Sequence, residues 1–95
     1  MDNTEARSVL RVELAKYRAK DYGQLAALVG NPQTREVTAP SGTRYQLEVQ
    51  ALWDDPARPN GVLRIAGAID DGGVRAYAPL TDAFLLAPTG EFVGE

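Results

Sequence analysis

The feature that most constrains the fold of this chain is a run of alternating residues near its middle. In the stretch "RYQLEVQALW", residues 44–53, every second side chain is apolar. Successive side chains of a β-strand point to opposite faces of a sheet. The run therefore predicts a long strand with one face against a core and the other toward water. The side chains assigned to the core face are Tyr45, Leu47, Val49, Ala51 and Trp53.

A turn signal stands directly before this strand. The residues "APSG", 39–42, suit a three-residue loop in which a type I turn at Pro40 is closed by Gly42 at positive φ. Such a loop predicts a preceding strand that places Val37 opposite Tyr45 on the apolar face.

The tail of the chain repeats this turn chemistry. The residues "APTG", 87–90, predict a second three-residue loop, which places Leu86 opposite Phe92 and Leu85 opposite Val93. Both faces of this hairpin are apolar. We therefore expect it either to be buried on both sides or to contact another chain.

The stretch "AIDDGGVRAYAPL", residues 68–80, raises the question of an ion or phosphate site. A two-residue type I′ turn with Asp71 and Gly72 at its tip keeps apolar pairs together on one face. The pairs of this register are Ile69 with Val74, Gly67 with Ala76, Ile65 with Ala78, Leu63 with Leu80, Ala68 with Arg75 and Ala66 with Tyr77. We therefore expect a tight hairpin turn here.

Two considerations argue against a ligand site at these aspartates. The order of the strands places Asp54–Asp55 at the far end of the same strand from Asp70–Asp71, about 25 Å away at roughly 3.3 Å per residue. One metal ion cannot use both pairs. A phosphate-binding glycine loop leads into a helix, whereas a strand is expected after "DDGG", and two carboxylates repel an anion. We predict no metal site.

The first part of the chain has the period of a helix. Its apolar stripe consists of Ala6, Leu10, Leu14 and Tyr17. Asp2 with Glu5 resembles a capping box at the start of this helix. These features predict one amphipathic helix with a single buried side.

A second, shorter helix is expected after the first. Asp21 and Gln24 have the spacing of a capping box, and "GNP", 30–32, ends the helical pattern because proline cannot continue it. The side chains expected on its buried side are Leu25, Leu28 and Val29.

These segments predict one α+β domain over residues 1–95. Two N-terminal helices, in residues 1–31, pack on one face of a four-stranded antiparallel meander, in residues 33–80. Residues 81–95 form a C-terminal hairpin or irregular tail.

Composition removes several classes of chemistry. The chain has no cysteine and no histidine. Disulfides, cysteine-type zinc sites and serine–histidine or cysteine–histidine catalysis are therefore excluded. We expect a non-catalytic protein, with no catalytic residue and no cofactor.

The charge distribution bears on partners. Residues 1–35 carry six basic and four acidic groups, whereas residues 36–95 carry four and nine. Clustered lysine and arginine, as nucleic-acid binding requires, are missing. No apolar run reaches the roughly 18 residues of a membrane span, and the first residues are unlike a signal peptide. We expect a cytoplasmic protein with no nucleic-acid or membrane partner.

The sheet face away from the helices is the candidate interaction surface. Its long polar side chains surround a floor of Ala66 and Ala68, and tyrosine and arginine are common binding hot spots. The candidate residues are Arg44, Gln46, Glu48, Gln50, Arg64, Arg75 and Tyr77, together with Phe92 of the tail. An ordinary solvated sheet face is the alternative.

The stretches "GTRYQLEVQALWDD", "IDDGGVRAYAPLTDAFLLAP" and "EFVGE" resemble a family of small stand-alone bacterial proteins with no assigned activity. The resemblance covers nearly the whole chain, although Val74 stands where such sequences often have a bulky aromatic. It implies no substrate, cofactor or functional residue.

Three functions stay open at this point. The first is a protein-interaction module that binds a partner or a second copy, because edge strands and apolar hairpins invite pairing. The second is an immunity-type inhibitor that binds a basic target. The third is a small-ligand or enzyme domain on the open sheet face that uses Glu48 with the arginines and Tyr77.

Overall fold

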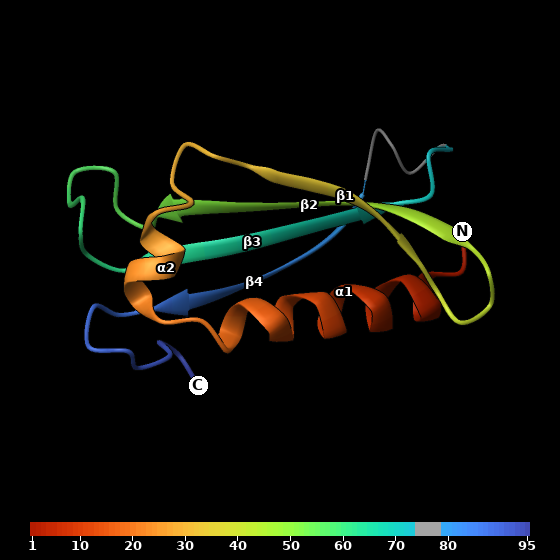
Figure 1. Ribbon diagram of the computed structural model, residues 1–95. Helices are drawn as coiled ribbons and strands as arrows, with labels where there is room; N and C mark the ends of the chain where they lie inside the picture. The colour runs from red at the N-terminus through yellow and green to blue at the C-terminus, as the bar shows by residue number, and fades with distance from the viewer. Residues whose placement is uncertain (74–78) are drawn as a thin grey trace.

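A computed structural model describes residues 1–73 and 79–95 of the chain. The helices are α1 (Asn3–Arg18) and α2 (Tyr22–Ala26), and the strands are β1 (Gln33–Thr38), β2 (Arg44–Trp53), β3 (Leu63–Asp70) and β4 (Leu80–Leu86). The strands pair antiparallel in the order β1-β2-β3-β4 (Figure 1). The predicted α+β class and the meander are therefore confirmed, with one long helix and one very short one.

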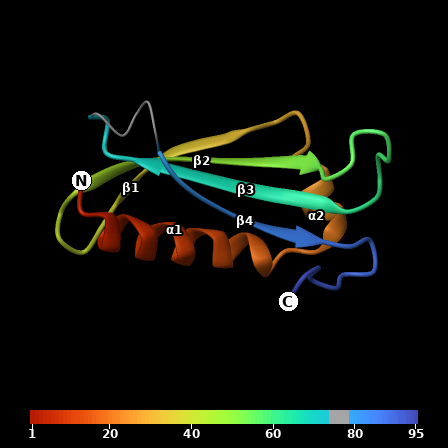
Figure 2. The ribbon, with the colours of Figure 1, turned by 180° about the vertical axis from the view of Figure 1, so that it is seen from behind.

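Helix α1 begins where the sequence predicts. Asp2 is the N-cap, and its carboxylate accepts the backbone N–H of Glu5 at 3.0 Å. The buried residues of the helix are Ala6, Val9, Leu10, Glu13 and Leu14. Figures 1 and 2 show α1 lying along one side of the sheet. The capping box is only half formed, because the Glu5 side chain bonds elsewhere.

A glycine in β3 brings α1 close to the sheet. Gly67 lies under the helix, and a Cβ atom placed on it would come within 2.8 Å of Leu10 Cδ1 and 3.0 Å of Leu14 Cδ2. The absent side chain therefore allows both leucines to pack directly on the backbone of β3.

Helix α2 is a single capped turn. Asp21 and Gln24 form the complete predicted capping box, with bonds of 2.8 and 3.0 Å between each side chain and the other's backbone N–H. The helix ends at Ala26, earlier than expected, because the chain turns to bring Val29 beside Ala51 of β2. Leu25 is fully buried.

The alternation in β2 sorts side chains as predicted. Tyr45, Leu47, Val49 and Ala51 are all at most 3% exposed, and Val37 of β1 stands opposite Tyr45. Trp53 is partly buried and packs against the same core. The apolar face of the sheet therefore faces the helices.

The two similar turns share one backbone geometry. In the first, Ala39 donates its N–H to Thr43 at 2.8 Å and accepts from Gly42, whose φ is +90°. In the second, Ala87 donates to Glu91 at 2.9 Å and accepts from Gly90, whose φ is +91°. Both loops were predicted from the sequence.

The tail hairpin has the expected partners. Leu86 pairs with Phe92, and the Val93 N–H donates to the Leu85 carbonyl at 3.0 Å. The end of the chain thereby covers the last part of the β4 edge.

The predicted connection between the third and fourth strands is wrong. Ile69 pairs with Leu80 rather than Val74, and Leu63 pairs with Leu86 rather than Leu80. The fourth strand therefore lies at Leu80–Leu86, beyond the predicted sheet limit at residue 80. The other observed pairs are Arg64 with Leu85, Ile65 with Phe84, Ala66 with Ala83, Gly67 with Asp82 and Ala68 with Thr81.

Burial explains which register is adopted. The observed register places Asp82 opposite Gly67 on the helix side, but it buries Phe84 and Leu86, at 5% and 3% exposed. The predicted one would have placed small alanines opposite Ile65 and Gly67. Large side chains gain more free energy on burial than alanine does, roughly 1.5–3 kcal/mol each.

No helix in the described part of the chain is long and apolar enough to cross a membrane.

Candidate functional site

The predicted interaction residues of the open face lie on one side of the sheet. Arg44, Gln46, Glu48 and Gln50 alternate with the core residues of β2, and Arg64 pairs opposite Leu52 of the same strand. The other two predicted residues, Arg75 and Tyr77, lie outside the described residues. The positions opposite Ala68 and Ala66, which were predicted for Arg75 and Tyr77, are occupied by Thr81 and Ala83 of β4.

The charged residues of this face pair with near neighbours. Arg64 donates to the Asp54 carboxylate at 2.9 Å, and Arg44 lies 3.9 Å from Glu36. Of the larger apolar side chains there, Leu52 is 45% exposed. The three hollows found along α1 are not lined by any of the predicted open-face residues that the structure describes. The described face is therefore a layer of polar side chains over an alanine floor.

Phe92 lies on the other side of the sheet. Its ring meets that of Phe84 edge to face, with centroids 5.8 Å apart, and the guanidinium of Arg18 lies 4.1 Å above its centroid. Arg18 also donates to the Glu95 carboxylate at 2.8 Å, which raises the pKa of Arg18 and lowers that of Glu95. Phe92 is half-buried and joins the tail to α1 and β4.

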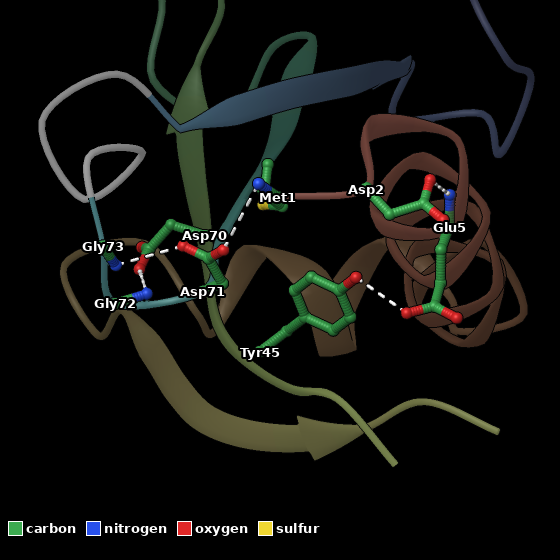
Figure 3. A network of polar contacts seen from close by, with 8 residues as sticks. All are labelled: Met1, Asp2, Glu5, Tyr45, Asp70, Asp71, Gly72 and Gly73. Carbon is green, nitrogen blue, oxygen red and sulfur yellow. Dashed lines mark hydrogen bonds and ion pairs between the residues drawn. The ribbon is translucent and has the colours of Figure 1, made fainter. Parts of the chain in front are cut away.

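The aspartates of the "DDGG" stretch bond to backbone. Asp70 accepts the N–H of Gly72 at 2.8 Å, and Asp71 accepts that of Gly73 at 3.0 Å (Figure 3). The second oxygen of Asp71 lies 3.7 Å from the Met1 amino group. Asp54 follows Trp53, which pairs with the first residue of β3, whereas Asp70 is the last residue of β3. The two aspartates therefore lie at opposite ends of this strand, as predicted. Among the described residues, no three acidic groups gather into a cluster that could hold a metal ion.

A buried hydroxyl links the first helix to the sheet at the same end of the molecule. Tyr45 is fully buried, and its hydroxyl donates to Glu5 Oε1 at 2.8 Å (Figure 3). Ser41 of the first turn donates to the same oxygen, also at 2.8 Å. Burial, with the bond to Glu5 second, raises the pKa of Tyr45 to about 12.

A buried carboxylate forms a second link between helix and sheet. Glu13 is 5% exposed, and it forms ion pairs with Lys16, at 3.0 Å, and with Arg35 of β1. Sequence reasoning missed Glu13. The signal was its spacing of four residues from Val9 and of three from Leu10, which places it on the buried side of α1.

Between these two links lies a groove of about 520 Å³, within the usual range of binding pockets, roughly 300–1,000 Å³. Its walls are the first three turns of α1 and the end of β1 with the turn that follows. The apolar residues of its lining are Val9, Val12, Val37, Ala39 and Pro40, and its acidic residues are Asp2, Glu5 and Glu13. We call this hollow the α1–β1 groove.

The α1–β1 groove has two uncommon properties. Val12 on its wall is 59% exposed, more than any other large apolar residue in the described part of the chain. No lysine or arginine is among the described residues of its lining. Within the described residues Asp2 and Glu5 form no ion pair, whereas Glu13 is neutralised.

Two smaller hollows lie along the helix. One, of about 430 Å³, lies between the end of α1 and β4, beside the Arg18–Glu95 pair. The other, of about 230 Å³, is formed by the exposed side of α1 around Arg7.

Comparison of the chain with models of protein families, with curated proteins and with solved structures finds no match. The resemblance to a bacterial family therefore stays a prediction, and function must be argued from the geometry alone.

Proposed function

We propose that this chain is a non-catalytic protein-binding domain that holds a segment of another polypeptide in the α1–β1 groove. One observation carries the proposal. The groove combines a concave apolar lining, an exposed valine and, at one end, carboxylates that form no ion pair with a described residue. Exposed apolar surface is costly to leave in water, and when rimmed by polar groups it is typical of protein-interaction sites.

The links at the two ends of the groove support this proposal. Glu13 with Arg35 fixes α1 to β1 on one side, and Glu5 with Ser41 and Tyr45 fixes it to the hairpin on the other. A site whose walls are held by side-chain bonds of this kind loses little conformational freedom on binding. More of the contact energy is then available as affinity.

An immunity-type inhibitor of a basic target is a second candidate that uses the same end of the molecule. Asp2, Glu5, Asp70 and Asp71 all lie around the N-terminal end of α1 (Figure 3). Opposite charge accelerates association and is screened by salt. The small-ligand alternative needs Arg75 and Tyr77, which lie outside the described residues, and it stays a prediction.

The proposal is tested by selecting peptides from a displayed random library against the folded chain. The selected peptides are then titrated against two variants, Val12→Gln in the groove and Leu52→Gln on the open face. Both replaced side chains are exposed, so we expect both variants to fold, with circular dichroism as the check.

We expect Val12→Gln to weaken binding about tenfold or more, since burying a valine contributes roughly 1.5 kcal/mol or more. Leu52→Gln should leave the affinity within about twofold. The opposite pattern would place binding on the open face, and failure to select any peptide would contradict the proposed function itself.

A further inference from the structure

The free backbone edge of β1 borders the α1–β1 groove. β1 is an outer strand of the sheet, and five of its six residues are exposed. In an antiparallel strand, neighbouring residues direct their N–H and C=O groups to opposite sides. Ala39 directs its N–H across the hairpin to Thr43, so the backbone groups of Thr38, Glu36 and Thr34 face away from β2.

The opposite edge of the sheet is occupied. On β4, the Leu85 carbonyl accepts the N–H of Val93, and Ala87 donates to Glu91. Farther back along the strand, the outward N–H of Ala83 donates to the Asp82 carboxylate at 2.8 Å. Proteins commonly block edge strands in these ways, because an open edge recruits further strands.

No comparable block lies on β1 within the described part of the chain. No described backbone group outside the sheet bonds to Thr34, Glu36 or Thr38. The last part of the β4 edge is thus covered by the chain itself, whereas no described backbone group covers the β1 edge beside the groove.

We infer that the segment bound in the groove is extended; this inference rests on the proposed function. The segment adds to β1 as a fifth strand and carries lysine or arginine residues beside its apolar ones. Its backbone bonds to Thr34, Glu36 and Thr38. Every second side chain then points to the helix side of the sheet, into the α1–β1 groove.

Charge favours a basic segment. The lining carries Asp2 and Glu5 at the end near the start of α1, with no basic residue among the described ones. A bound segment that places an apolar side chain against Val12 and Val37 therefore has these carboxylates beside it. A lysine or arginine at the neighbouring position of the segment is attracted to them.

A second copy of the chain fits this edge less well. An added strand must keep residues of the same face opposite one another. The two antiparallel registers that pair nearly all of β1 with itself place Glu36 opposite Glu36, or Arg35 opposite Arg35. Like charges directly opposite destabilise a pair of strands.

The first test compares two pools of short synthetic peptides. In one pool apolar residues alternate with lysine or arginine, and in the other they alternate with aspartate or glutamate. We expect the basic pool to bind at least about tenfold more tightly at low salt, and its advantage to shrink as salt rises. Equal affinity of the two pools overturns the charge assignment.

The second test separates strand addition from simple docking. The best-binding basic peptide is made in two N-methylated forms, one methylated on its odd residues and the other on its even residues. Only one edge of an added strand faces β1, so one form should lose binding by at least about tenfold and the other should keep it. Equal effects of the two forms overturn strand addition.

The outcomes distinguish the two levels of the proposal. If the two methylated forms behave alike but binding still depends on Val12, the groove binds peptides without strand addition, and only the further inference fails. If binding is insensitive to Val12→Gln, the proposed function fails as well. Sedimentation equilibrium on the chain alone is expected to give the monomer mass, and a dimer that these peptides dissociate would instead assign the edge to a second copy.

Discussion

The Tyr45 hydroxyl makes a pH-dependent contribution to stability. Its pKa is about 12 in the folded chain against an ordinary value of 10.0, because the ring is buried and the hydroxyl bonds to Glu5. The unfolded chain therefore releases this proton first as the pH rises. The stabilisation is fully present below about pH 10 and is lost as the pH rises toward about 12.

We expect Tyr45→Phe to reduce that loss of stability between about pH 10 and 12. At neutral pH the variant should cost about 1 kcal/mol, since one hydrogen bond is removed while Ser41 still bonds to Glu5. Urea unfolding at a series of pH values measures both effects. Tyr17→Phe is the control. If both variants changed the pH dependence of the free energy of unfolding equally, the role assigned to the burial of Tyr45 would be contradicted.

Single residues show where sequence reasoning reached its limit. Asp2 and Asp21 were predictable as caps because capping depends on local spacing. The Glu13–Arg35 pair was not, because it joins residues far apart in the chain and forms only after α1 packs on the sheet. A glutamate on an apolar stripe indicates that a basic partner is present without identifying it.

At the scale of elements, two turns of the same chemistry allow a matched comparison. Gly42 and Gly90 both have φ near +90°. Replacement of either by alanine strains the backbone by roughly 1–3 kcal/mol. The first turn joins β1 to β2, whereas the second holds only the tail against β4.

We therefore expect Gly42→Ala to lower the free energy of unfolding of the whole sheet by about 1–3 kcal/mol. Gly90→Ala should instead release the tail locally, with faster hydrogen exchange at Val93 and a smaller change in global stability. Chemical unfolding combined with hydrogen exchange separates the two. Identical global losses would show that the tail is an integral part of the cooperative core.

The β3–β4 connection shows why element boundaries were only partly predictable. The "DDGG" signal favours a tight turn, and the short-range pattern is consistent with one. The observed register is selected instead by tertiary burial of Phe84 and Leu86 against the core. Alternation fixed the face of each side chain in β3, but it did not fix which partner strand lies opposite.

At the scale of the whole molecule, the proposed binding surface could not have been found from the sequence. The open sheet face follows from alternation in one segment, so its β2 and β3 residues were predictable. The α1–β1 groove is formed by residues from two distant elements whose neighbourhood depends on the completed fold. Val12 is unremarkable in sequence, and only its exposure of 59% beside this groove singles it out.

The most direct test of the whole account is hydrogen exchange of individual backbone amides, measured with and without a saturating library-selected peptide. We expect exchange to slow at Thr34, Glu36 and Thr38, the outward amides of β1, because each gains a partner or a cover when the edge is filled. Unchanged exchange at these three amides, with slowing at Thr81 and Ala83 of β4 instead, would contradict it.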